Sequence, residues 1–361
     1  MGEAGATALL VGVGPELEWL TGYAAHGNER LNLLVIPAAA EPVYISPRLE
    51  APAALAAAGL ADGRVRIEAW EETDDPFLHV PSHLPPQAPL RLLVSDGLRA
   101  AFVLGLQAVL PGASWGLASS VLGPLRRVKD GDEIALLRAA AHAADRAMER
   151  IVRGPLVGRT EVAVARDVRD TLVDEGHDTA EFAIVASGPN SASPHHEPSD
   201  RVIGPGEPLL LDIGGRRAGY SSDITRTVWI EAEAGRGPEA AFRTIYELTA
   251  AGQAAARAAV RPGVAFEALD AAAREVIAAG GFGERFIHRL GHGIGLEVHE
   301  EPYAVAGNSE PAVAGNTFSC EPGIYLEGRY GVRIEDIVLC TEDGGESLNE
   351  APRELRVVSG R

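Results

Sequence analysis

The sequence predicts an α+β protein of two domains, a small α/β domain followed by a larger domain in which helices pack on mostly antiparallel strands. The chain has 361 residues, of which 46% are hydrophobic, so it can bury more than the core of a single domain. The pattern changes near residue 125. Short apolar runs alternate with alanine-rich segments before this point, whereas two helical segments and a hairpin recur in the same order after it. We therefore expect domains at 1–125 and 126–361.

The first 125 residues predict a small α/β domain. Apolar runs at 31–36 and 90–94 are typical of strands, and the alanine-rich segment 47–60 favours helix. The proline-rich stretch 81–86 predicts a surface loop. Gly12-Val13-Gly14-Pro15 is not a phosphate-binding loop, because it lacks the third glycine and has a proline where a backbone amide must donate. This domain alone does not indicate a function.

The first half of the larger domain begins with a helix signal. Asp130 and Glu133 predict a capping box that opens a helix extending to about residue 153. A second helix is expected at 160–176, and strand-like segments lead to a hairpin at 208–230.

The same order then recurs. A helix is expected from Pro238 to about residue 260, where Pro262-Gly263 stops it, and another ends at Gly280-Gly281. A second hairpin is expected at 318–339. Since each half contributes two helices and one hairpin, the sequence predicts a pseudo-twofold domain with its functional site at the centre.

Composition excludes several classes of function. Acidic residues exceed basic ones by 51 to 32, which gives a net charge of −19, so we do not expect a nucleic-acid partner. No apolar run reaches the roughly 18–20 residues of a membrane span, and Met1-Gly2-Glu3-Ala4 lacks the basic start of a signal peptide. Cys320 and Cys340 are too few for a disulfide scaffold, which favours the reducing cytoplasm. Lys129 is the sole lysine, so Schiff-base chemistry is not expected.

Four carboxylates and one imidazole lie in apolar or glycine-rich stretches of the larger domain: Asp212, Asp223, His292, Glu321 and Glu335. Asp212 lies within the apolar run 209–213, which is typical of a buried strand. An unpaired carboxylate there would be strongly destabilising or would take up a proton. Two metal sites that share bridging carboxylates would remove this cost, and pairs of metals about 3.5–4 Å apart activate water for hydrolysis. The sequence therefore predicts a hydrolase with two divalent metal ions.

The residues around these ligands carry a family resemblance. Five motifs occur in order: Leu211-Asp212-Ile213-Gly214-Gly215, Gly219-Tyr220-Ser221-Ser222-Asp223-Ile224-Thr225-Arg226, His288-Arg289-Leu290-Gly291-His292-Gly293-Ile294-Gly295-Leu296-Glu297-Val298-His299-Glu300, Glu321-Pro322-Gly323-Ile324-Tyr325 and Val332-Arg333-Ile334-Glu335-Asp336. Together they resemble the Xaa-Pro dipeptidase and aminopeptidase P group of the pita-bread (M24) metallopeptidases. Trp19-Leu20-Thr21-Gly22-Tyr23 also resembles the start of that group's N-terminal domain. The resemblance implies a creatinase/prolidase-like N-terminal domain followed by a pita-bread catalytic domain.

The resemblance also implies a metal centre. By similarity, Asp212 binds one ion, Asp223 and Glu335 bridge both ions, and His292 and Glu321 complete the coordination. Oxygen-rich sites with one imidazole suit Mn²⁺ or Co²⁺, and Zn²⁺ is an alternative.

Catalytic and substrate-binding roles follow from the same resemblance. Glu321 would also carry a proton to the leaving proline nitrogen, and His195 and His299 match positions that contact the substrate carbonyl or the oxyanion. Arg333 and Glu335 are two apart in a predicted strand and would share a face, so Arg333 could orient Glu335 or hold a substrate carboxylate. Arg30, on the loop 24–30, is a second candidate for the substrate carboxylate if that loop reaches a catalytic site in its own or a partner subunit.

Several functions remain open at this stage. We favour an Xaa-Pro dipeptidase that acts on small proline-containing peptides as a cytoplasmic homodimer, and the alternative within the family is an aminopeptidase P that acts on longer peptides. A metal-free amidinohydrolase similar to creatinase and a non-catalytic binding protein use the same fold, but such relatives replace the metal ligands, whereas here the ligand set is complete. Glu300 is expected either to be solvated or to lie behind the metal ligands, and Arg226 is expected to be a structural ion-pair partner.

Overall fold

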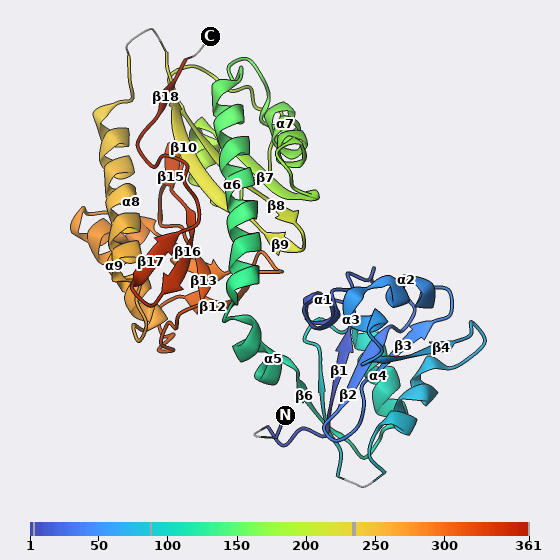
Figure 1. Ribbon diagram of the computed structural model, residues 1–361. Helices are drawn as coiled ribbons and strands as arrows, with labels where there is room; N and C mark the ends of the chain where they lie inside the picture. The colour runs from blue at the N-terminus through green and yellow to red at the C-terminus, as the bar shows by residue number, and fades with distance from the viewer. Residues whose placement is uncertain (3, 87–88, 233–235, 360–361) are drawn as a thin grey trace. The chain divides into compact units, whose positions relative to one another are not determined.

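The computed structural model describes residues 1–2, 4–86, 89–232 and 236–359. These residues form two compact units, Met1–Arg126 and Arg127–Arg361 (Figure 1). In the described part of the chain, no helix is both long and apolar enough to span a membrane.

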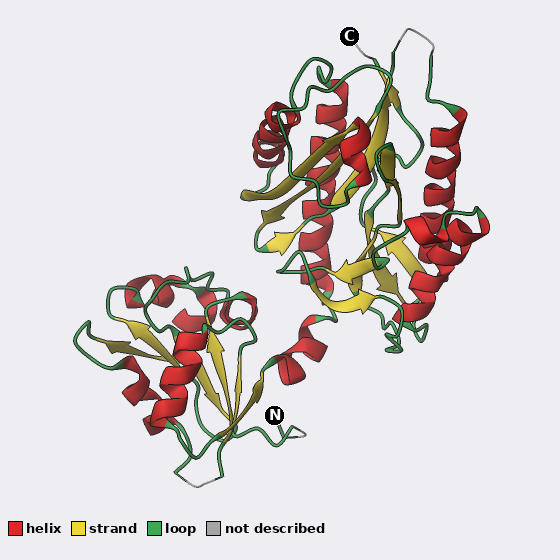
Figure 2. Ribbon diagram, turned by 180° about the vertical axis from the view of Figure 1, so that it is seen from behind, coloured by secondary structure: helices red, strands yellow, loops and turns green. Residues whose placement is uncertain are grey.

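The first unit is built on a six-stranded mixed sheet with the strand order β4-β3-β2-β1-β5-β6. Its strands are β1 (Ala8–Gly12), β2 (Leu33–Pro37), β3 (Val43–Pro47), β4 (Arg66–Trp70), β5 (Arg91–Val94) and β6 (Ser114–Leu117). Its helices are α1 (Pro15–Thr21), α2 (Ala51–Ala56), α3 (Ala58–Ala61), α4 (Ala100–Val109) and α5 (Ser119–Arg126), with a 3-10 helix η1 (Pro76–His83). Alternate residues of β1 face two separate apolar clusters, with Leu10 in one and Leu9 in the other. Both faces of this sheet are therefore covered (Figure 2).

Two expectations for this unit were wrong in detail. Segment 47–60 is not one helix, because Pro47 ends β3 and the extended residue Ala57 separates α2 from α3. The break brings Gly59 against α1, where an added Cβ would lie 2.6 Å from the Thr21 carbonyl oxygen. Part of the expected loop 81–86 belongs to η1.

The first half of the second unit contains α6 (Gly131–Arg153) and α7 (Glu161–Asp174). Its strands are β7 (Thr179–Ser187), β8 (Pro208–Arg217), β9 (Tyr220–Ser221), β10 (Ile224–Ile230) and β18 (Val357–Val358), and the sheet order is β18-β10-β8-β7 with β9 paired to β8. The predicted capping box is confirmed, since Asp130 accepts from the amides of Asp132 and Glu133 while Glu133 accepts from the amide of Asp130. A 3-10 helix, η2 (Gly188–Ala192), follows β7.

The second half repeats this plan with α8 (Ala240–Ala259) and α9 (Phe266–Ala279), followed by a short 3-10 helix η3 (Gly283–Arg285). Its strands are β11 (Gly291–Gly293), β12 (Glu300–Ala304), β13 (Thr317–Cys320), β16 (Asp336–Thr341) and β17 (Gly344–Ser347), in the order β12-β11-β13-β16-β17. A separate two-stranded ribbon consists of β14 (Gly323–Leu326) and β15 (Tyr330–Arg333).

Each half has its own apolar core. Residues of α6 and α7, such as Val168, cluster with Leu211 of β8. Residues of α8 and α9 cluster with the second sheet, where the rings of Phe266 and Phe318 meet edge to face with centroids 5.4 Å apart. The strands thus lie between two pairs of helices (Figures 1 and 2), and the predicted pita-bread architecture is confirmed.

The two predicted hairpins differ in the structure. The first is confirmed, since β8 and β10 pair antiparallel with Asp212 opposite Thr225. The second is interrupted, because β13 and β16 pair only as far as Cys320 and Asp336, after which the chain leaves the sheet to form the ribbon.

The interruption changes the expected position of two acids. Pro322 has no amide hydrogen with which to continue the strand pairing, and Glu321 and Glu335 lie in the two gaps between the sheet and the ribbon. The expectation that Arg333 and Glu335 share one strand face was therefore wrong, because β15 ends at Arg333.

Candidate metal centre and active site

The structure brings the five predicted ligands together at the centre of the second unit. Ligand atoms of Asp223, His292 and Glu335 all lie within 4.8 Å of one another. His292 Nε2 is 3.6 Å from Asp223 Oδ2 and 3.3 Å from Glu321 Oε1. Asp212 on β8 acts electrostatically on both Asp223 and Glu335. Both halves of the unit therefore contribute to one cluster of ligands.

The side chain of His292 is oriented by its own strand. Its Nδ1 lies 3.1 Å from the Gly293 carbonyl oxygen, and an Nδ1–H that donates there directs Nε2 toward the carboxylates. A lone pair on Nε2 beside two carboxylate oxygens is unfavourable unless a proton or a cation lies between them. This arrangement suits a metal ligand.

Burial makes the carboxylate cluster costly without a cation. It raises the pKa of Asp212, Asp223 and Glu335, and repulsion from the neighbouring carboxylates raises the pKa of Asp223 and Glu335 further. For Glu321, burial acts in the same direction, but the hydrogen bond and charge of His292 hold the pKa at about 2.

Two oxygen atoms in the cluster have no hydrogen-bond partner among the described residues. Oδ1 of Asp212 and Oδ1 of Asp223 are both buried and unpaired. Buried polar atoms are ordinarily satisfied, and a divalent cation would satisfy both of these oxygens. The residues present therefore fit a divalent metal ion.

Arg333 binds the cluster from one side. Its Nη2 donates to Asp212 Oδ2 at 2.5 Å and its Nε donates to Thr225 Oγ1 at 3.1 Å. Thr225 Oγ1 in turn donates to Glu335 Oε2 at 2.5 Å. Only 3% of the Arg333 side chain is exposed, and Nη1 donates to Tyr325 and to the Pro194 carbonyl. These contacts fit the orienting role expected for Arg333 and leave its donors little capacity for a substrate carboxylate.

A second arginine holds the backbone behind the cluster. Arg226 Nη1 donates to the carbonyl oxygens of Thr225 and Glu335, at 2.9 and 2.6 Å, and Nη2 donates to Asp336 Oδ1 at 2.8 Å. Burial raises the pKa of Asp336, but the charges of Arg226 and Arg353 outweigh it and lower that pKa. The predicted structural role of Arg226 as an ion-pair partner is confirmed.

The two predicted catalytic histidines differ in their surroundings. The ring of His299 lies edge-on to His292 with centroids 4.0 Å apart. Partial burial and the neighbouring His292 lower the pKa of His299 to about 4. His195 is exposed and follows η2, and its charge also acts on His299. Arg30 belongs to the first unit, where its guanidinium donates to Glu72 at 2.7 Å.

Of the two expectations for Glu300, solvation was wrong. It is 8% exposed, and its carboxylate accepts a hydrogen bond from Nζ of Lys129, which is 4% exposed. A Cβ added to Gly295 would lie 3.0 Å from the Lys129 side chain. The sole lysine is therefore buried beneath the turn that carries His299, because its charge is paired there.

Three residues matter to the site although the sequence analysis gave them no role in it. The importance of Thr225 is apparent only from the register of β8 and β10, which places it opposite Asp212. Tyr325 accepts from Arg333 and lies 2.9 Å from Nε2 of His288. Glu161 is completely buried. In the sequence it stands at the start of a predicted helix, where acids are common because they interact favourably with the helix dipole, so its position gave no sign of another role.

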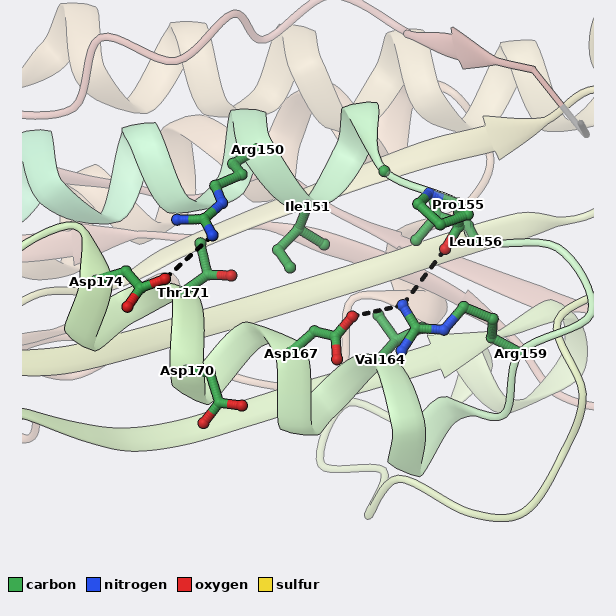
Figure 3. A pocket seen from close by; sticks show the side chains of 11 residues that line it. Arg150, Ile151, Pro155, Leu156, Arg159, Val164, Asp167, Asp170, Thr171 and Asp174 are labelled. Atoms are coloured by element: carbon green, nitrogen blue, oxygen red, sulfur yellow. Dashed lines mark hydrogen bonds and ion pairs between the residues drawn. The ribbon is translucent and has the colours of Figure 1, made fainter.

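A separate hollow of about 320 Å³ lies between α6 and α7 (Figure 3). Two ion pairs line it. Arg150 of α6 pairs with Asp174 of α7 at 3.0 Å, and Arg159, just before α7, pairs with Asp167 at 2.6 Å. None of the predicted site residues is among the described residues that line it. We assign no part of the candidate site to this hollow.

Comparison with known proteins agrees with this geometry. Residues 135–342 match the model of Metallopeptidase family M24. The chain belongs to this family. Residues 1–128 of this M24 metallopeptidase match the Creatinase/Prolidase N-terminal domain.

Individual relatives of this M24 metallopeptidase carry dipeptidase names. It is 46% identical over 357 residues to "Probable dipeptidase PepE" of Mycobacterium tuberculosis, covering 99% of this chain and 93% of that protein. It is 34% identical over 348 residues to "Xaa-Pro dipeptidase" of Lactobacillus delbrueckii subsp. lactis, covering 95% and 92%. A crystal structure of recombinant prolidase from Thermococcus sibiricus matches with a TM-score of 0.91 and 35% identity, covering 99% and 96%.

We expect metal binding by this M24 metallopeptidase to release protons and to strengthen as the pH rises. Burial and repulsion raise the pKa of Asp212, Asp223 and Glu335 when no cation is bound, so a binding cation must displace protons from these carboxyl groups. Lowering the pH favours the protonated carboxyls and therefore opposes metal binding. Titration calorimetry of the chelator-treated protein with Mn²⁺, in two buffers of different ionisation enthalpy, measures the protons released. Affinity that falls with rising pH would contradict this expectation.

Proposed function

We propose that this chain is a cytoplasmic, homodimeric Xaa-Pro dipeptidase that hydrolyses the peptide bond before proline with two divalent metal ions, Mn²⁺ being the preferred ion. The observation that carries the proposal is the buried convergence of four carboxylates and His292. Two of the carboxylate oxygens lack a hydrogen-bond partner among the described residues. Membership of the M24 family supports a metallopeptidase, and the names of the relatives support a dipeptidase in particular. Co²⁺ and Zn²⁺ are the alternative ions.

The proposed ligands are the five residues of the cluster: Asp212, Asp223, His292, Glu321 and Glu335. Asp223 and Glu335 are the two acids proposed to be shared between the ions. Bound divalent ions supply positive charge that polarises the substrate carbonyl and lowers the pKa of water. Proton transfer and hydrogen bonding to the substrate are proposed to be carried out by side chains of the protein.

Glu321 is the proposed proton carrier. Its Oε1 accepts a hydrogen bond from Ser319 Oγ at 2.9 Å, which orients the carboxylate. An ionised carboxylate at this position among the proposed ligands can accept a proton and pass it on. The leaving proline nitrogen must be protonated before it departs, and Glu321 would return the proton there.

His299 and His195 are the proposed donors to the substrate. With a pKa of about 4, His299 is neutral near neutral pH and can donate a hydrogen bond through one ring nitrogen. Such a donor stabilises the negative charge that develops on the carbonyl oxygen during attack. His195 is exposed and acts electrostatically on His299, which supports a place for it at the substrate.

Arg30 is the proposed ligand of the substrate's own carboxylate. A dipeptide has a free carboxylate directly after proline, and a nearby cation would select it by charge-assisted hydrogen bonds. The donors of Arg333 are engaged by Asp212, Thr225 and Tyr325 in a buried position, so we propose Arg333 only as an orienting residue. Arg30 also pairs with acids, but 30% of its side chain is exposed, so a substrate carboxylate can compete for its donors. The complete ligand set argues against a creatinase-like amidinohydrolase and a non-catalytic binding protein.

Chelation should abolish hydrolysis of an Xaa-Pro dipeptide, and Mn²⁺ or Co²⁺ should restore it. The clustered carboxylates repel one another without cations, and water then keeps its ordinary pKa. Initial rates measured alongside metal content by atomic emission test this dependence. Full activity in a preparation shown to hold no metal would refute the proposed mechanism.

Glu321→Gln should lower kcat by about 100-fold or more, because the amide can neither accept the proton nor supply the ligand charge. His299→Ala serves as a comparison, since it should also lower kcat while leaving the metal content unchanged. Steady-state kinetics and metal analysis of both variants are the measurements. Near-normal turnover by Glu321→Gln with its metals bound would remove Glu321 from the role of proton carrier.

The chain should cleave an Xaa-Pro dipeptide with a higher kcat/KM than the same peptide extended by two residues. This preference requires a cation at the dipeptide carboxylate. Arg30→Gln should therefore raise KM for the dipeptide but not for the extended peptide, so that the ratio of the two kcat/KM values falls. Arg64→Gln, which changes another arginine of the first unit that pairs with an acid, Asp62, is the matched control. Faster cleavage of the extended peptide would favour aminopeptidase P instead.

A further inference from the structure

Glu161, at the start of α7, is a completely buried carboxylate to which neither the proposed function nor the metal centre gives a role. Its carboxylate accepts hydrogen bonds only from residues 187–199 among the contacts the structure describes. The donors are Ser187 N and Oγ, both at 2.7 Å, Asn190 Nδ2 at 3.0 and 3.2 Å, His196 Nε2 at 2.8 Å, Ser199 N at 3.1 Å and Ser199 Oγ at 2.6 Å. One carboxylate thus fastens both ends and the middle of this segment.

The backbone near Glu161 reinforces the same attachment. Its own amide donates to the Arg201 carbonyl at 3.0 Å, and the amide of Val162 donates to the Ser199 carbonyl at 3.1 Å. These bonds use amides of the first turn of α7, which have no partner within the helix. The end of the segment is therefore fixed to a rigid helix.

The other side of the segment contacts the ribbon that ends at Arg333. Gly331 N donates to Ser191 Oγ at 2.9 Å, and a Cβ added to Gly331 would lie 2.2 Å from the Ser191 carbonyl oxygen. Arg333 Nη1 donates to the Pro194 carbonyl at 3.2 Å, while its Nη2 binds Asp212. His195 follows Pro194 directly.

We propose that Glu161 is a positioning residue for hydrolysis: by holding segment 187–199 between α7 and the ribbon, it fixes His195 at the substrate. This inference rests on the proposed function and adds to it the residue that orients the exposed histidine. An acid that served only the dipole of α7 would need no donors from another segment. Here the bonds to the carboxylate come from the segment that carries His195.

The test is a double-mutant cycle with Glu161→Gln and His195→Ala. The amide of Gln turns a donor toward Ser187, Asn190 or Ser199, where an acceptor is required, so the segment should loosen. We expect Glu161→Gln to lower kcat/KM for an Xaa-Pro dipeptide by about 10- to 100-fold, mainly through kcat, because the donor is misplaced in the transition state. In the His195→Ala background the same change should cost less than about 2-fold.

A second readout does not depend on activity. Hydrogen–deuterium exchange should show faster exchange at the amides of Ser187 and Ser199 in Glu161→Gln, with wild-type metal content. Asp145→Asn is the matched control, because Asp145 is also a buried acid that accepts from a neighbouring loop, at Asn349 and Glu350. The control should leave the exchange of segment 187–199 unchanged. Its effect on kcat/KM should also be additive with that of His195→Ala.

Several outcomes would overturn the inference. Additive losses in the double mutant, or unchanged exchange at Ser187 and Ser199, would mean that Glu161 does not act through His195. If Glu161→Gln fails to fold, Ser199→Ala is the substitute, because it removes one side-chain donor to Glu161 and introduces no new polar group. Its effect on kcat/KM must then also shrink in the His195→Ala background, although the effect itself will be smaller. Failure of the wild-type enzyme to cleave Xaa-Pro dipeptides would refute the proposed function, whereas cleavage without coupling would refute this inference alone.

Discussion

Repulsion among buried carboxylates is the constraint on which the rest of the catalytic unit depends. Asp212, Asp223, Glu321 and Glu335 carry up to four negative charges, and Arg333 supplies one positive charge beside them. Such a cluster tends to separate or to take up protons. The surrounding bonds prevent separation, since Arg226 fastens the backbone of Thr225 and Glu335 and is itself held by buried Asp336. The protein thus keeps the acids close together and leaves divalent ions to neutralise them.

The sequence predicted the architecture well because its signals were local. The capping box at Asp130 and Glu133, the order of helices and hairpins, and the apolar run around Asp212 each depend on neighbouring residues. The ligand set followed from an acid in a buried strand together with the family resemblance. These local signals agree with the structure. The alanine-rich segment 47–60 and the spacing of Arg333 and Glu335 were also local signals, and there contacts with other segments overturned the prediction.

The remaining features depend on contacts between distant segments. The interruption of the second hairpin at Pro322, the pairing of Thr225 with Asp212 and the ion pair of Lys129 with Glu300 each join residues that only the fold brings together. A charged residue in a polar stretch is ordinarily solvated, so burial of Lys129 had no sign in the sequence. The helix break at Ala57 likewise reflects the approach of Gly59 to Thr21 rather than the helix preference of alanine.

The burial of Lys129 has a practical consequence. The chain has no other lysine, and this one is ion-paired beneath the turn of His299 with 1% of its side chain exposed. An acylating reagent added to the folded protein therefore has little access to this amine. Modification of Lys129 requires the catalytic unit to open locally, so the rate of acylation at this one side chain would report how often that region opens.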